Sequence, residues 1–333
     1  MTKSEMLYRS LFGFALADAY GVPFEFEPRY YATLHNMNKS MVGYGSHCQP
    51  PGTWSDDTSM VLATMDILSS WDTLIDLKKG EFDEELLHNL MEAFKDWRYN
   101  GRYGCYGECF DLGFTTDTAI KQYEQNRNPR TCGQAQEFNC GNGSLMRIFP
   151  LAYLINQLPH YKRYNWCDIF SSLTHAHPLT SLCSFFYLEM YLSILDGSQL
   201  NAAIEDAIES VKIMRIADSF RAIDLGKCSR ILKNELQGLE VSEIKSTGYV
   251  VDTLEAVIWC LAKGTCYQSS VHLAVTLGND TDTIAALVGA IAAIIYKEPF
   301  PLEWMEELKN TDLLVSIAAK FSAIYCENAG VPI

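Results

Sequence analysis

The sequence lacks any Cys-x-x-C pair, although it contains 11 cysteines in 333 residues. The closest spacings are Cys105 with Cys109 and Cys260 with Cys266, and neither has a matching second pair at the distance that structural zinc sites require. An odd number of cysteines in a chain of this length also does not fit a disulfide framework. The pattern argues against both scaffolds and predicts reduced thiols buried as small hydrophobic side chains.

Positive charge is also scarce. Lys and Arg number 26 against 41 Asp and Glu, so the formal net charge is −15 and the isoelectric point is about 4.9. An acidic surface argues against broad binding to nucleic acids or anionic membranes, because both carry negative charge themselves. We therefore expect no nucleic-acid partner and no association with a membrane.

No hydrophobic run is long enough to suggest a membrane span. The longest apolar stretch, residues 284–296, is well short of the roughly 20 residues that a transmembrane helix requires. Near the N-terminus, Lys3 and Arg9 precede a short apolar run that imitates a signal peptide, but Glu5 dilutes the basic region and the run has only the minimum length. We therefore expect a cytoplasmic protein.

Alternating β-branched runs bounded by hairpin turns are hard to find, whereas apolar residues recur at three- and four-residue spacing. The longest loop candidate, residues 122–142, contains no low-complexity tract, and no internal repeat or long linker divides the chain. We therefore predict an all-α fold, a compact helical bundle with a single domain over residues 1–333 that is most simply a monomer. The predicted helices cover residues 7–15, 60–68, 86–97, 185–195, 203–213, 250–261 and 284–296.

Two acidic segments each lead directly into an apolar helix: residues 52–60 and residues 278–283. Either one alone is explained as a helix start, with Ser55 or Asp56 as N-cap and acidic groups favoured by the helix dipole. If the two starts face each other, four carboxylates gather, and two divalent cations would cancel their formal charge. Oxygen ligands suit Mg²⁺ or Mn²⁺ better than zinc or copper, and a pair of such ions would favour hydrolysis. The hypothesis requires Asp56 and Asp282 to meet in the fold.

Three other segments have both a structural and a functional interpretation. The glycine-bearing turn at residues 141–147 is a plain turn or an approach to a phosphate. His175, in the segment 174–178, is more commonly a satisfied polar contact than a metal ligand. Asp111 lies beside apolar residues, where it is a perturbed acid, a cap or a buried hydrogen-bonding group.

Taken in order, these segments resemble the ADP-ribosylglycohydrolase family over nearly the whole chain. The matching segments are residues 13–25, 54–58, 141–147, 174–175, 248–253 and 280–283. The resemblance implies a compact all-α domain with a dinuclear Mg²⁺ centre in a cleft that holds ADP-ribose. Two departures leave every proposed ligand in place: Ala17 replaces the usual Gly before the first Asp, and Asn279 replaces the second Gly of a frequent Gly-Gly-Asp.

The resemblance also assigns roles to residues of this chain. Asp282 would be the residue that bridges the two ions, and His175 would help to hold the nucleotide or ribose. The metal site would consist of Ser55, Asp56, Asp57, Asp280, Asp282 and Thr283, and the phosphate-binding turn of Gly141, Asn142, Gly143 and Ser144. Asp111, Glu25 and Asp56 would be the catalytic residues.

Within the family, residues 103–113 resemble the branch containing dinitrogenase-reductase-activating glycohydrolase, which removes ADP-ribose from arginine. Asp111 would then do acid and base work near the ribose. A glutamate that matches Glu25 is important in the serine-directed branch, so hydrolysis of serine-linked or other O-linked ADP-ribose stays open. The partners implied are ADP-ribose, an ADP-ribosylated protein and, in a binding-only alternative, an ADP-ribosyltransferase toxin that an immunity protein blocks.

An all-α phosphohydrolase with a His-Asp metal motif would also suit the composition. No His-Asp dipeptide occurs among the seven histidines. Phosphodiester cleavage is therefore a poorer interpretation than glycosidic cleavage.

Overall fold

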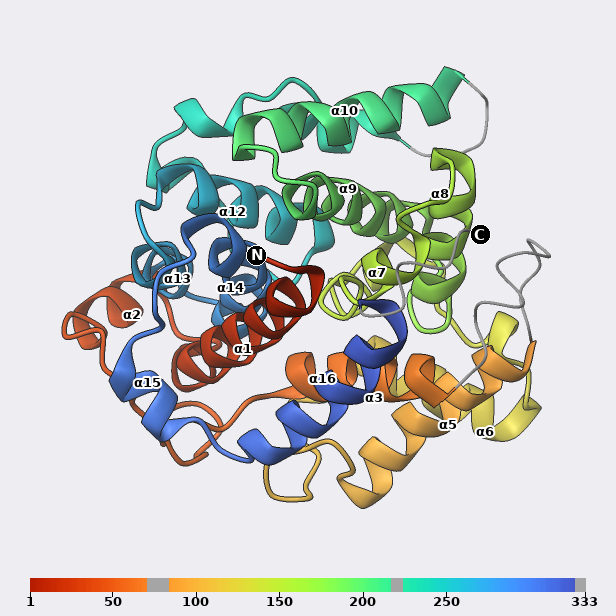
Figure 1. The fold of residues 1–333 in the computed structure, drawn as a ribbon, viewed down its shortest axis with the longest axis horizontal. Coiled ribbons are helices and arrows are strands. Elements are labelled where there is room, and N and C mark those ends of the chain that lie inside the picture. Colours follow the sequence, from red (N-terminus) through yellow and green to blue (C-terminus); the bar gives the residue numbers. More distant parts are fainter. Residues whose placement is uncertain (71–83, 217–223, 327–333) are drawn as a thin grey trace.

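The computed structural model describes residues 1–70, 84–216 and 224–326, which form α-helices joined by turns, loops and short 3-10 helices, with no strand in these ranges (Figure 1). The predicted all-α fold is confirmed. The helices are α1 (Lys3–Gly21), α2 (Arg29–His35), α3 (Asp56–Ser70), α5 (Glu84–Asn100), α6 (Phe114–Asn126), α7 (Leu151–Ile155), α8 (His160–Ser172), α9 (Pro178–Leu195), α10 (Leu200–Ile216), α11 (Ser229–Leu232), α12 (Val250–Lys263), α13 (Tyr267–Thr276), α14 (Thr281–Tyr296), α15 (Leu302–Glu307) and α16 (Thr311–Tyr325).

Every helix predicted from apolar spacing is present, and each is longer than the segment that predicted it. The expected loop at residues 122–142 is the partial exception, because α6 continues to Asn126 and two short 3-10 turns follow at Pro129–Thr131 and Glu137–Asn139. The apolar residues of α6 are few, so its last turn leaves little periodicity in the sequence. The loop prediction was therefore too long at its N-terminal end.

The centre of the fold is the antiparallel pair α1 and α14, around which the other helices are arranged (Figure 1). In α14 every residue from Thr281 to Ile294 is buried, because α1, α12 and α13 pack around it. The helix α9 is long and apolar enough to cross a membrane, but 89% of its residues are buried inside the protein. It packs between α8 and α10, so its hydrophobicity is that of a core helix.

All 11 cysteines are free thiols, as the sequence predicted. Seven are buried and one, Cys48, is exposed. Burial raises the pKa of Cys105 and Cys260, so these thiols stay protonated and act as small hydrophobic groups.

Two glycines allow α1 and α14 to approach each other closely. A Cβ on Gly13 would lie 2.6 Å from the Cβ of Ala293, and a Cβ on Gly289 would lie 2.6 Å from that of Ala17. Both distances are shorter than real contacts, so larger residues would force the helices apart.

We expect Gly289→Leu to lower the free energy of unfolding by about 3 kcal/mol, because overpacking a rigid core costs this much. Gly238→Ala is the matched control, since a Cβ on Gly238 would have no neighbour within 4 Å. Thermal unfolding monitored by circular dichroism measures both. Equal melting temperatures for the two variants would contradict the close packing of α1 and α14.

Candidate active site

The N-termini of α3 and α14 meet, although they are far apart in the sequence. The hydroxyl of Thr283 donates to Oδ2 of Asp57 over 3.1 Å, across 226 positions of the chain. Gly21 at the end of α1 permits this approach, because a Cβ there would lie 2.5 Å from the Cα of Asp282. The hypothesis that the two acidic segments face each other is therefore confirmed.

Ser55 caps α3 as expected, since its hydroxyl accepts from the backbone N–H of Asp57 over 3.3 Å and donates to the carboxylate of Asp57 over 3.2 Å. Asp18, on α1, also stabilises the N-terminus of α3. Its carboxylate accepts from the backbone N–H groups of Ser55 and Thr58 over 2.9 and 3.0 Å, and from the Thr58 hydroxyl over 2.6 Å. Asp18 is completely buried, and burial raises its pKa to about 6.

The site predicted from the sequence does not include Asp18. The signal available was a carboxylate within the apolar stretch of α1, where a charged group is buried only if it has partners.

Several carboxylate oxygens in this cluster are buried without a hydrogen-bond partner. They are Oδ1 of Asp57 and both carboxylate oxygens of Asp282. Burial, followed by the charges of neighbouring carboxylates, raises the pKa of Asp56, Asp57 and Asp282 well above their usual range. Such an arrangement is costly without a positive charge. The all-oxygen donor set therefore fits a hard divalent cation.

Glu25 and Asp111 lie together beside the acidic helix ends. Oxygen atoms of Glu25, Asp280 and Asp282 lie within 4.8 Å of one another, and the same holds for ligand atoms of Glu25, His47 and Asp111. Burial, then the charges of Asp282 and Asp280, raises the pKa of Glu25 to about 11. Burial, then the charge of Glu25, raises the pKa of Asp111 to about 9. Both predicted acids therefore lie together beside the acidic helix ends, and their catalytic roles stay a prediction.

His47 joins these two acids and was missed by the sequence analysis. Its Nε2 contacts Oε2 of Glu25 and lies 3.7 Å from Oδ1 of Asp111. Residues 44–49 show no periodicity and no motif, so no sequence signal points to this contact.

The turn at residues 141–144 lies against the acidic cluster. The side-chain amide of Asn142 donates to Oδ2 of Asp280 over 2.6 Å and to the hydroxyl of Thr253 over 2.9 Å. Gly141 forms an isolated bridge with Tyr249, and the N–H of Asn142 donates to the carbonyl of Gly248 over 3.0 Å. This N–H is therefore occupied within the protein, and the phosphate-binding role of the turn stays a prediction.

His175 packs directly on this turn. A Cβ on Gly143 would lie 2.8 Å from Cε1 of the imidazole, so glycine is required for the contact. Burial, together with the charge of Arg147, lowers the pKa of His175 to about 3, which keeps the ring neutral. Ser144 is fully buried and accepts a hydrogen bond from Ser171 over 2.8 Å. Its hydroxyl therefore supports the turn from inside.

Glu137, Cys140 and His177 form a third group whose ligand atoms lie within 4.8 Å of one another. Nδ1 of His177 accepts from the N–H of Leu179, so in the neutral ring Nε2 carries the proton and faces Glu137 over 3.3 Å. Glu137 also pairs with Lys227. The group is therefore better explained as an ion-pair cluster than as a metal site.

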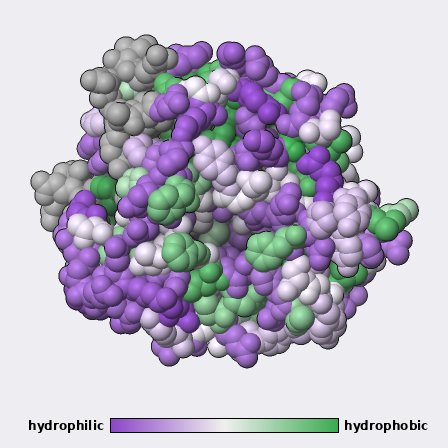
Figure 2. Space-filling model, turned by 180° about the vertical axis from the view of Figure 1, so that it is seen from behind, coloured by the Kyte–Doolittle hydropathy of each residue, from purple (hydrophilic) through white to green (hydrophobic). Residues whose placement is uncertain are grey.

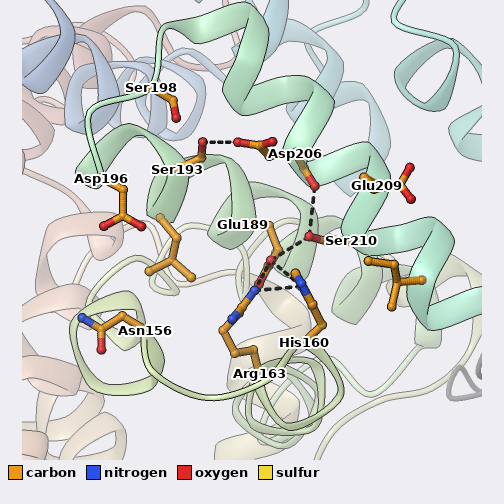
Figure 3. A pocket seen from close by; sticks show the side chains of 12 residues that line it. Asn156, His160, Arg163, Glu189, Ser193, Asp196, Ser198, Asp206, Glu209 and Ser210 are labelled. Carbon is orange, nitrogen blue, oxygen red and sulfur yellow. Dashed lines mark hydrogen bonds and ion pairs between the residues drawn. The ribbon is translucent and has the colours of Figure 1, made fainter.

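A separate cavity of about 360 Å³ opens between α8, α9 and α10 and shares no residue with the acidic cluster (Figure 3). At its centre Glu189 accepts hydrogen bonds from Arg163 over 2.5 Å and Ser210 over 2.8 Å, and Nδ1 of His160 lies 3.1 Å from the same carboxylate. None of the unpartnered buried polar atoms found in the described residues belongs to its lining. These groups therefore satisfy one another and hold the three helices together.

Comparisons with known proteins identify the family and the fold. The sequence profile of the ADP-ribosylglycohydrolase family matches residues 2–329. ADP-ribosylarginine hydrolase Tri1 of Serratia proteamaculans (strain 568) is 29% identical over 310 residues, which cover 93% of this chain and 76% of that protein. ADP-ribosyl-[dinitrogen reductase] glycohydrolase of Rhodospirillum rubrum is 25% identical over 299 residues, covering 89% of this chain and 87% of that protein.

A solved structure described as an ADP-ribosylglycohydrolase-related protein complex has the same fold, with a TM-score of 0.76 and 23% sequence identity. The match covers 97% of this chain and 98% of the solved chain. Together with the sequence profile, it shows that the predicted family and fold are correct. The chain belongs to the ADP-ribosylglycohydrolase family and is a glycohydrolase enzyme.

Proposed function

We propose that this enzyme hydrolyses the N-glycosidic bond between ADP-ribose and an arginine side chain of a modified protein, in a Mg²⁺-dependent reaction. The observation that carries the proposal is the meeting of two acidic helix ends with Glu25 and Asp111, next to the turn that packs on His175. Several of these carboxylates are buried without hydrogen-bond partners. A site of this kind suits a cationic reacting group, and guanidinium is cationic.

The proposed metal ligands are Ser55, Asp56, Asp57, Asp280, Asp282 and Thr283. Two Mg²⁺ ions bound there would supply Lewis-acid positioning of ribose hydroxyls and of a water molecule. Asn142 contributes by holding Asp280, and Asp18 by fixing the N-terminus of α3. Mn²⁺ would fit the same oxygen ligands.

Asp111 is proposed as the group that moves the proton. The bond between ribose C1′ and the guanidino nitrogen breaks while the oxygen of water bonds to C1′. The leaving nitrogen gains a proton, and the attacking water loses one. Burial and the charge of Glu25 raise the pKa of Asp111 to about 9 in the metal-free protein, which favours a carboxyl group that holds a proton and can pass it to the nitrogen. Glu25 lies beside Asp111 and is the second acid of the proposed pair.

Arginine linkage is favoured by the names of two relatives, the Tri1 hydrolases of Serratia proteamaculans and of Pseudomonas putida (strain GB-1), each 29% identical to this chain. The position of Glu25 at the centre of the cluster favours serine-linked ADP-ribose as the second candidate. ADP-ribosylhydrolase ARH3 of Danio rerio is a more distant relative, at 24% identity over 310 residues.

The test is release of ADP-ribose from two peptides of one sequence, modified on arginine or on serine, with Mg²⁺ and with EDTA. We expect metal-dependent release from the arginine-linked peptide to be at least about 100-fold faster, which corresponds to roughly 2.7 kcal/mol between the two transition states. Faster release from the serine-linked peptide would select the second candidate. Binding of ADP-ribose without release from either would favour a binding protein that blocks a transferase.

We also propose a monomeric, cytoplasmic enzyme. Figure 2 shows one face of the molecule, on which most side chains are hydrophilic. The hydrophobic side chains on this face lie in separate groups, several of them around a central hollow. Separate hydrophobic groups among polar ones are normal on the surface of a monomer. Free thiols at all 11 cysteines are compatible with a reducing compartment.

A further inference from the structure

The segment that carries His47 is fastened to the segment that carries Glu25. The N–H of Ser46 donates to the carbonyl of Pro23 over 3.3 Å, and the Ser46 hydroxyl donates to the carbonyl of Glu25. Gly45 makes this possible, because a Cβ there would collide with the backbone of Pro23. The two segments therefore act as one unit, and the position of His47 is set relative to Glu25.

The imidazole of His47 is held on its other sides as well. Its centroid lies 5.6 Å from the ring of Phe26 and 5.4 Å from the ring of Phe110, both at tilted angles. Phe110 directly precedes Asp111, whose backbone has a φ of 57°. A non-glycine residue in this left-handed region needs support from its surroundings. The ring of His47 thus lies between the two loops that carry the two acids.

The polar end of the ring points at both acids. Nε2 contacts Oε2 of Glu25 and lies 3.7 Å from Oδ1 of Asp111, while the side chains of His47, Glu25 and Asp111 are only 13, 8 and 14% exposed. Two carboxyl groups this close repel each other whenever both are charged. A neutral donor between them stabilises one arrangement of the pair without adding charge.

We propose that His47 is a positioning residue, which holds Glu25 and Asp111 in their reactive arrangement by donating from Nε2 to Glu25 and by packing between their loops. The proposal rests on the proposed function, since it assumes that this pair of acids serves the hydrolysis. His47 acts through Glu25 and Asp111, so its removal should change the rate of the chemical step rather than the binding of ADP-ribose.

The experiment compares His47→Ala with His47→Gln on the arginine-linked peptide. The amide nitrogen of glutamine reaches the position of Nε2, so this variant retains the donor. We expect His47→Ala to lower kcat by about 30-fold with KM changed less than about threefold, because a small misplacement of reacting groups costs this much. His47→Gln should recover kcat to within about threefold of the original enzyme. Cys48→Ser, an exposed neighbour in the same loop, is the matched control with unchanged kcat.

A double-mutant cycle with Glu25→Gln separates positioning from general damage to the loop. If His47 acts through Glu25, then His47→Ala should have little further effect on kcat in the Glu25→Gln background. Full additivity of the two effects would overturn the proposal, as would an unchanged kcat in His47→Ala or a glutamine variant no better than alanine.

The proposal has a readout that does not depend on activity. In crystal structures, the carboxyl group of Glu25 should be displaced in His47→Ala and should keep its place in His47→Gln. If the unsubstituted enzyme releases no ADP-ribose from either peptide, the proposed function fails, and this comparison still decides the role of His47. An unmoved Glu25 in His47→Ala would overturn the positioning role.

Discussion

Asp57→Asn combined with Asp282→Asn should abolish stabilisation by Mg²⁺ while making the metal-free protein more stable than the original. In the original protein, three carboxylate oxygens of these two residues are buried without a hydrogen-bond partner. Asparagine removes the charge and keeps the volume, and its amide can donate to the carboxylates that remain. The hydroxyls of Ser55 and Thr283 retain an acceptor at position 57.

The measurement is thermal unfolding with EDTA and with Mg²⁺. Saturation of the original protein at about 100 times the dissociation constant should add about 2.7 kcal/mol, which raises the melting temperature by roughly 5 °C in a protein of this size. The double variant should show no Mg²⁺ shift, and hydrolysis should fall at least about 1000-fold through the loss of several kcal/mol of transition-state stabilisation. A variant that loses stability in EDTA would show that these carboxylates support the fold rather than a cation.

The pH dependence in EDTA follows from the buried carboxyl groups that surround Asp57 and Asp282. Their pKa values in the folded protein are raised, to about 6 for Asp18 and about 9 for Asp111, above the values near 4 that carboxyl groups have in an unfolded chain. Stability is then complete below about pH 4 and is lost as the pH rises through 6 and towards 9, because the unfolded chain releases these protons while the buried groups of the folded protein keep them. The double variant should lose less stability over this range, and Mg²⁺ should flatten the curve of the original protein.

The helices could be predicted because their signal is local. Apolar spacing within one turn of α3, α12 or α14 reports the face that is buried, whatever that face packs against. Helix ends were less accurate, and α6 shows why: its last residues carry few apolar side chains. For the start of α3 the sequence offered Ser55 or Asp56 as N-cap, and Ser55 is the cap, through a contact that depends only on neighbouring residues.

The candidate site could be predicted only in part. The acidic segments were identified because each carries its chemistry within a few residues. That they meet was a hypothesis, since no contact between them can be read from the sequence. Asn142 was placed in the phosphate turn, but its bond to Asp280 spans 138 positions. His47 and Asp18 act through tertiary contacts alone. For His47 these contacts leave no local pattern in the sequence, whereas the only sequence signal for Asp18 is a carboxylate within the apolar stretch of α1.

Asp111→Asn should lower kcat about 1000-fold while leaving the fold and the affinity for ADP-ribose intact. General acid and base groups contribute 10²–10⁴-fold to rates, and asparagine cannot transfer the proton. After glycine, asparagine is also among the residues that best tolerate the left-handed backbone at this position, where φ is 57°. Alanine there would add backbone strain, so its effect would mix folding with chemistry.

The measurement is release of ADP-ribose from the arginine-linked peptide under saturating Mg²⁺, with ADP-ribose affinity determined by calorimetry. Asp117→Asn is the matched control, since that residue lies on the neighbouring helix α6 and pairs with Arg98 and Lys121. Its kcat should be unchanged. If Asp111→Asn keeps its rate while Glu25→Gln loses it, the proton passes through Glu25. The assignment of the two acids would then be reversed, and His47 would contact the catalytic acid itself.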